Sequence, residues 1–323
     1  DAGGVRLLTG TALGPTMQAA VGRFVAAFPG CQHVAWDALH GSAVLDAHAR
    51  THGLRVAPRV RLDRADVILS VDADFLGTWV SPVEFAAGYR DGRTLAGEHA
   101  RFSYHAQVES RMSLTGSRAD HRVRATPHET RALLAGVAGR LGARAGVTAP
   151  FAAVSLSATL SASADDLATR LWEAKGRSVV LCGLKDADAQ SVANFANHVL
   201  GAYGTVLDLA TPSRQLQGDD EAMATLLAEL KDGAVGALVI IGSNPVLQHV
   251  EGAVFGAALA TVRSCCPGCT NTGSVTLRPS ALPSLTRSPD RTPRLAAALT
   301  ERAATLSQVT LLIGSGSSCS QAL

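Results

Sequence analysis

The chain has 323 residues, with 29 Lys and Arg against 27 Asp and Glu, and 47% of its residues are hydrophobic. This length accommodates two domains or one large α/β domain, at roughly 100–200 residues per domain, and the apolar fraction excludes a disordered chain. A net charge of +2 gives no electrostatic case for binding nucleic acid, because such binders usually carry a clustered basic face. No window reaches the ~18 apolar residues of a membrane-spanning helix.

The start of the chain and its cysteines say little about the compartment. The first residue is Asp1 and no signal-peptide pattern follows it, so we interpret the sequence as an internal fragment whose signal, if any, lies upstream. Six Cys in so long a chain indicate neither a disulfide scaffold nor a particular redox environment.

The first half alternates short apolar strands with Ala-rich helices, a pattern typical of a parallel sheet with crossover helices. We expect strands at residues 5–8, 33–36, 65–71 and 104–108, and helices at residues 15–28, 83–87 and 129–141. Gly142 has the position of a C-cap for the last of these helices.

The alternation repeats after a linker-like stretch at residues 146–150. Ser163 is a plausible N-cap for a helix at residues 165–175, and further strands are expected at residues 178–182, 204–209 and 237–241, with helices at residues 188–200 and 219–231. This rhythm predicts two doubly wound α/β units with mostly parallel sheets. We divide the chain into a first unit (1–145), a linker and bridging helix (146–175), a second unit (176–263) and an irregular, partly disordered tail (264–323) that includes one more strand at residues 309–313.

Two of the predicted strands end alike. Residues 64–74 and 235–245 each join a buried strand to a small, polar loop, and ligands favour the carboxyl ends of such strands. The match indicates either a weak internal repeat or the ordinary composition of such loops. Asp72 and Asp74 are an acid/base pair or, as we favour, caps that accept backbone N–H bonds. We expect Asp72 and Gly242 to face one cleft.

The second of these loops, called here the Gly242 loop, is the more specific and consists of Gly242, Ser243, Asn244 and Pro245. Glycine permits close backbone approach, asparagine offers donors and acceptors, and proline stiffens the turn. Such a loop can read a flat polar edge such as guanine, and an ordinary strand-ending turn explains it equally well.

Familiar catalytic and metal motifs are missing. The chain has no dinucleotide fingerprint, P-loop, H-E-x-x-H or nucleophile-elbow motif. Cys266 and Cys269 form a C-x-x-C without the second pair that a zinc or iron–sulfur site typically needs. His48 and His52 would share one side of a helix, but without a third ligand we expect them to be solvated. We therefore predict no catalytic residue and no metal site.

An ordered set of segments resembles a known family. Residues 65–77, 115–122, 176–183 and 239–246 follow one another as in the molybdopterin-oxidoreductase superfamily. The likeness extends over about residues 5–262 and is strongest to the molybdopterin-oxidoreductase-like domain of the iron–sulfur subunit of alternative complex III, a quinol:acceptor oxidoreductase.

The resemblance implies where a cofactor would bind. Catalytic members hold two pterin guanine dinucleotides, carrying molybdenum or tungsten, in the loops after these strands. A retained dinucleotide would contact the Gly242 loop and Asp120. Two departures argue against retention. Asp72 and Asp74 replace a G-x-N-P-like loop, and carboxylates near a pyrophosphate repel it by several kcal/mol in a partly desolvated site. Residues 127–130 read P-H-E-T where catalytic members have P-G-[ST]-D.

The resemblance therefore implies a domain without a pterin cofactor, with a structural and assembly role in a membrane-attached, quinol-oxidising electron-transfer complex, at the periplasmic face. Its partners would be other subunits, and iron–sulfur clusters would lie elsewhere in the parent chain. The alternatives are a fragment of a catalytic molybdopterin enzyme and an unrelated α/β binding protein.

Beyond Val262 the family's expected His- and Glu-rich stretch is missing. A reading-frame shift near Arg263 is one hypothesis, which translation of the DNA in the other frames tests.

Overall fold

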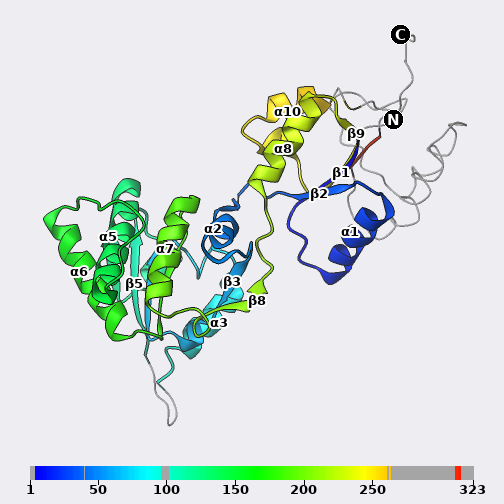
Figure 1. The fold of residues 1–323 in the computed structure, drawn as a ribbon. Coiled ribbons are helices and arrows are strands. Elements are labelled where there is room, and N and C mark those ends of the chain that lie inside the picture. Colours follow the sequence, from blue (N-terminus) through cyan, green and yellow to red (C-terminus); the bar gives the residue numbers. More distant parts are fainter. Residues whose placement is uncertain (1–3, 40, 96–101, 260–261, 263–309, 314–323) are drawn as a thin grey trace, which may run out of the picture. The chain divides into compact units, whose positions relative to one another are not determined.

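The chain forms two compact α/β units (Figure 1), one of which is inserted into the other. This computed structural model describes residues 4–39, 41–95, 102–259, 262 and 310–313. Unit 1 comprises the residues up to Gly41 and those from Gln217 onward, and unit 2 is the continuous segment Ser42–Leu216. Within the described ranges, no helix is long and apolar enough to cross a membrane.

Unit 2 contains a parallel sheet with the strand order β6-β5-β4-β7. Its strands are β4 (Val67–Val71), β5 (Tyr104–Glu109), β6 (His121–Arg124) and β7 (Ser178–Cys182). Val71 pairs with both Val108 and Cys182, so the carboxyl ends of β5, β4 and β7 lie at one edge of the sheet. Strands β4 and β7 are almost continuous runs of buried Val, Ile and Leu, as parallel strands covered on both faces require.

Helices and loops cover both faces of this sheet. Helices α5 (Pro127–Ala145), α6 (Ala158–Glu173) and α7 (Ala187–Val199) bury a Leu-, Val- and Ala-rich core against one face (Figure 1). On the other face, α3 (Pro82–Asp91) and the loop after β4 enclose Phe75 and Tyr89. The remaining elements are α2 (Ala43–His52), the 3₁₀ turn η1 (Leu62–Arg64), α4 (Leu114–Ser117), and an antiparallel pair of β3 (Ala57–Val60) and β8 (Leu207–Ser213).

Unit 1 contains a mixed sheet with the order β10-β9-β1-β2. Strands β1 (Gly4–Thr9), β2 (Gln32–Ala35) and β9 (Val235–Ile241) are parallel, and β10 (Thr310–Ile313) runs antiparallel to β9. Helices α8 (Asp220–Lys231) and α10 (Gly252–Leu259) pack with Leu8 and Leu238. Helix α1 (Pro15–Ala27) contributes to a second cluster around Leu7 and Val239. The short helix α9 (Pro245–Gln248) follows β9.

The predicted α/β class with mostly parallel sheets is confirmed. The two units group different segments from the expected division, because strand pairing crosses it. Strand β7 extends the sheet of β4, and β9 pairs with β1. The expected strand at residues 204–209 corresponds to β8, which belongs to an antiparallel pair rather than to a parallel sheet.

Two helix ends differ from the prediction. Helix α5 continues through Gly142 and ends at Gly146, whose φ of 69° is left-handed. A Cβ on Gly142 would lie 2.8 Å from the Val147 carbonyl oxygen, so this glycine serves close packing and not capping. Helix α6 begins before Ser163 and is capped by Ser157, which accepts a bond from the Leu160 N–H.

Two predicted features lie outside the described residues. They are the C-x-x-C of Cys266 and Cys269, and the tail apart from β10.

Candidate functional site

The carboxyl edge of the unit 2 sheet is where a parallel α/β fold would bind a ligand. Strand order reverses between β4 and β7, and ligands usually sit in the crevice at such a switch point. Here the Gly183 N–H, just after β7, donates to the Val71 carbonyl oxygen at 2.8 Å. A Cβ on Gly183 would lie 2.0 Å from the carbonyl oxygen of Asp72. The loops after the two strands are therefore in direct backbone contact, which leaves no room between them for a phosphate group.

Two carboxylates lie at this edge. The side chain of Asp72 is exposed, and its backbone has a φ of 53°, which is uncommon for a residue other than glycine. Desolvation and the nearby Glu109 carboxylate raise the pKa of Asp72, against the opposing charge of Arg111. Glu109 is buried, but hydrogen bonds from Arg122 at 2.6 Å and from Ser113 hold its pKa below the ordinary value. Of the two carboxylates, Asp72 is the one exposed to a ligand at this edge, whereas Glu109 is buried and paired with Arg122.

Asp74 and the start of α5 have local structural roles. One oxygen of Asp74 accepts bonds from the Thr115 N–H at 3.0 Å and from its hydroxyl at 2.8 Å. This agrees with the capping interpretation, although the donor lies in α4, the short helix after β5, and not in the next turn. Thr126 and Glu129 form a reciprocal capping box at the start of α5, so the acid in the P-H-E-T stretch stabilises a helix end.

The predicted cofactor residue Asp120 lies at the opposite edge of the sheet, just before β6. Its carboxylate forms a two-pronged ion pair with Arg93, with N–O distances of 2.7 and 2.8 Å, and also accepts the His105 N–H. Burial works against ionisation, but the bonds from Arg93 prevail and lower the pKa of Asp120. Asp120 thus fixes the amino ends of β5 and β6 in unit 2, whereas the Gly242 loop belongs to unit 1.

The Gly242 loop follows β9 at the carboxyl edge of the unit 1 sheet. Gly242 has a φ of 67°, which glycine adopts without strain. The Asn244 side chain caps α9 by accepting the Leu247 N–H, and Pro245 occupies the first helical turn. Ser243 Oγ is buried and, among the described residues, has no hydrogen-bond partner. The loop is a strand-to-helix turn that leaves one buried hydroxyl unsatisfied. Because it and Asp72 belong to different units, a shared cleft stays a prediction.

Sequence reasoning missed Asp37, which lies just beyond β2 at the same edge of unit 1. Its carboxylate accepts the Thr11 N–H at 3.0 Å and the Thr11 hydroxyl, so it fixes the loop after β1. An acidic residue after the second strand of a β-α-β unit was the available signal, because such a residue often binds a ribose hydroxyl. In this chain the Asp37 carboxylate is instead bound by Thr11, in the loop after β1.

The histidine pair is not solvated as predicted. Both residues lie on α2, but His48 is only 2% exposed. Its Nδ1 lies 2.8 Å from the Val44 carbonyl oxygen, which only accepts, so Nδ1 carries the proton and Nε2 accepts from the Tyr203 hydroxyl at 3.2 Å. Burial lowers the pKa of His48, in agreement with a neutral ring. No group of three metal-ligating side chains occurs among the described residues.

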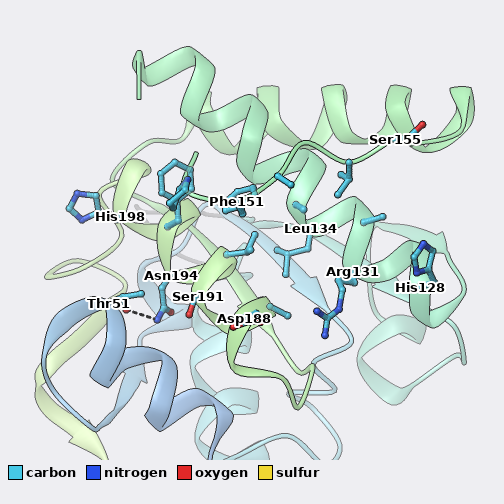
Figure 2. Close-up of a pocket in the computed structure, with 18 of the residues that line it drawn as sticks. Thr51, His128, Arg131, Leu134, Phe151, Ser155, Asp188, Ser191, Asn194 and His198 are labelled. Carbon is cyan, nitrogen blue, oxygen red and sulfur yellow. Dashed lines mark hydrogen bonds between the residues drawn. The ribbon is translucent and has the colours of Figure 1, made fainter. Parts of the chain in front are cut away.

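A pocket of about 950 Å³ lies away from these edges, between α5 and α7 in unit 2 (Figure 2). The loop of residues 150–155 borders it, and Thr51 and His52 at the end of α2 complete the wall. Figure 2 shows Leu134 and Phe151 at its apolar wall and Arg131 and Asp188 near one end. The sequence did not reveal this pocket, because its Ala, Val, Leu and Phe residues follow the same periodicity as core residues.

Comparison with known proteins gives little further information. No protein-family model and no curated protein matches the chain. A similar chain occurs in the crystal structure of the formyltransferase/hydrolase complex FhcABCD from Methylorubrum extorquens, determined with methylofuran. It is 19% identical over 62% of this chain and 49% of that chain, with a TM-score of 0.37, so this chain spans about half of that chain's length. A similarity at this level identifies no activity, ligand or partner.

Proposed function

We propose that the chain is an α/β domain without a pterin cofactor and is a structural, assembly-forming part of a membrane-attached, quinol-oxidising electron-transfer complex. The class of complex and the other subunits as partners come from the sequence resemblance to the molybdopterin-oxidoreductase superfamily. The absence of cofactor binding is supported by one observation in particular, the backbone contact between Gly183 and Asp72 at the switch point of unit 2.

A pyrophosphate at this edge would need space and hydrogen-bond donors. The Gly183 N–H already donates to Val71, and the exposed side chain at the edge is the carboxylate of Asp72. In a partly desolvated site this carboxylate repels a phosphate, and Glu109 is already paired with Arg122. The residues at this edge therefore do not fit a guanine dinucleotide, and we derive no chemical step through one.

The loss of a ligand site leaves the cores of the two units unaffected. In unit 2 the central strands are buried on both faces, and in unit 1 side chains from α8 and α10 pack against one face. Function resides in a site carried on the fold, so the fold can persist without the ligand site and still serve as a structural part of a complex.

The alternative, a fragment of a catalytic molybdopterin enzyme, is favoured by the Gly242 loop. Its left-handed glycine allows close backbone approach, and the buried Ser243 hydroxyl has no partner among the described residues. A guanine bound there would have to compete with α9 for the Asn244 side-chain oxygen, which accepts the Leu247 N–H.

Two measurements on the full-length protein, purified from its native source, test the proposal. Metal analysis for molybdenum and tungsten, with fluorescence of the oxidised pterin, should detect only traces. Stoichiometric metal and pterin would overturn the cofactor-free assignment and support the alternative. Native electrophoresis with quinol-dependent activity staining should place the protein in a multi-subunit complex. A protein that migrates as a free monomer would refute the assembly role.

A further inference from the structure

We propose that the pocket between α5 and α7 is a binding site for a small aromatic acid, a flat ring system that carries a carboxylate. The inference concerns unit 2 alone and does not depend on the proposed function. It stands on the size of the pocket, the chemistry of its walls and the charges around its rim.

The size of the pocket favours a small molecule over a protein partner. Its volume of about 950 Å³ lies at the upper end of the roughly 300–1,000 Å³ typical of ligand pockets. A stable protein interface buries about 800 Å² on each partner, which a single concavity between two helices does not supply. The loop of residues 150–155 makes the site a pocket and not a flat helix face (Figure 2).

The walls suit a flat aromatic ring. Phe151 and Phe195 meet edge to face, with their ring centroids 5.6 Å apart, and aromatic rings favour such contacts with a further ring. Ala132 and Ala135 on α5 also line the pocket, and their side chains are single methyl groups. The polar side chain of Asn194 is already bonded to Thr51 at 3.0 Å, so the interior presents mainly apolar surface.

The charges around the rim favour an acid over a base. Arg131 pairs with Asp186 at 2.6 Å, and Asp188 pairs with Arg50 at 3.2 Å, so each carboxylate is matched by a guanidinium. Three imidazoles also line the pocket, those of His52, His128 and His198. Each imidazole carries at least one N–H donor, so together with the Arg131 guanidinium these rings can donate hydrogen bonds to a carboxylate. The Arg131 side chain is 52% exposed, and an ion pair this exposed is weak enough for an incoming carboxylate to compete with it.

Isothermal titration of the full chain with two matched probes tests the proposal. The probes are 2-naphthoate and 2-naphthylmethylammonium, which share the same ring body and differ in the sign of the charge. We expect 2-naphthoate to bind about tenfold or more tightly than the amine, which corresponds to ~1.4 kcal/mol. Equal affinities, tighter binding of the amine, or no binding of either probe would overturn the proposal.

Variants on α5 locate the binding. Ala135→Trp fills the pocket and should abolish naphthoate binding, whereas Ala143→Trp, at an exposed position on the same helix, should leave it unchanged. Arg131→Gln should weaken naphthoate binding about three- to tenfold without affecting the amine, and Arg144→Gln is its control. If circular dichroism shows that Ala135→Trp misfolds, the smaller Ala132→Leu replaces it. Retained binding in a folded pocket-filling variant, or equal loss in Ala143→Trp, would show that the pocket is not the site.

Discussion

Replacing Gly183 with alanine tests the closed switch point of unit 2. The added methyl group would lie 2.0 Å from the Asp72 carbonyl oxygen and 2.5 Å from its carbon. Both are backbone atoms, so no flexible side chain can move aside, and the loops after β4 and β7 must separate. Overpacking of this kind destabilises by about 1–3 kcal/mol. Loss of the Gly183 N–H bond to Val71 adds ~1 kcal/mol. We therefore expect Gly183→Ala to lower the free energy of unfolding by about 3 kcal/mol.

The matched control is Gly139→Ala on α5, where a Cβ meets no atom within 4 Å. Alanine at a helical position without clashes should stabilise by about 0.5–1 kcal/mol. Urea unfolding followed by circular dichroism and tryptophan fluorescence measures both variants. A loss below about 1 kcal/mol for Gly183→Ala, with an unchanged urea dependence, would show that the two loops separate easily. The crevice would then be open to a ligand, contrary to our reasoning.

Three further predictions concern paired or buried polar groups of unit 2. Arg93→Gln should destabilise by about 2 kcal/mol, because it removes both bonds to Asp120. Since the pKa of Asp120 is lowered, its stabilisation is present above the ordinary carboxyl pKa and is lost as pH falls through the folded value. Urea unfolding at several pH values should show this loss in the wild type and not in the variant. Burial lowers the pKa of His105 to about 4, so its NMR titration should have a midpoint near 4. The free energy of unfolding should fall as the pH drops from 6.5 towards this folded-state pKa. A midpoint near 6.5 would contradict the buried position. Tyr203→Phe leaves the His48 Nε2 without its hydroxyl partner and should lower the free energy of unfolding by about 1–2 kcal/mol, measured by thermal unfolding. An unchanged stability would show that water can replace the tyrosine hydroxyl at that nitrogen.

The sequence predicts the buried strands and long helices well and the exposed strands poorly. Strands β4 and β7 are unbroken apolar runs because both of their faces are buried. Strand β6 has the sequence H-R-V-R, with one buried residue, and carries the charges typical of an edge, so its pattern does not distinguish it from a loop. Residues 57–60 of β3 contain a proline, which lowers the strand signal in the same way.

Local patterns predict turns and caps better than they predict the site. The capping box of Thr126 and Glu129 and the strand-ending turn at Gly242 depend on neighbours in sequence, whereas the donor to Asp74 is Thr115, 41 residues along the chain. Burial of His48 depends on Tyr203, far along the chain, and so has no local signal. Similarly, the likeness of residues 64–74 to 235–245 does not reflect equivalent positions. Strand β4 lies between two parallel neighbours, β5 and β7, whereas β9 lies between the parallel β1 and the antiparallel β10.

The insertion of one unit into the other also imposes an order of events during synthesis on the ribosome. Unit 2 is continuous, from Ser42 to Leu216, and has all its strands once that segment has emerged. Strand β1 is made first, yet its pairing of Leu7 with Val239 must wait for β9. Contacts so distant in sequence form slowly, because loop closure precedes any gain from pairing. Strand β2 is made before unit 2 and can pair with one edge of β1, but the edge that receives β9 stays open throughout the folding of unit 2. This open edge is where a chaperone would be needed most.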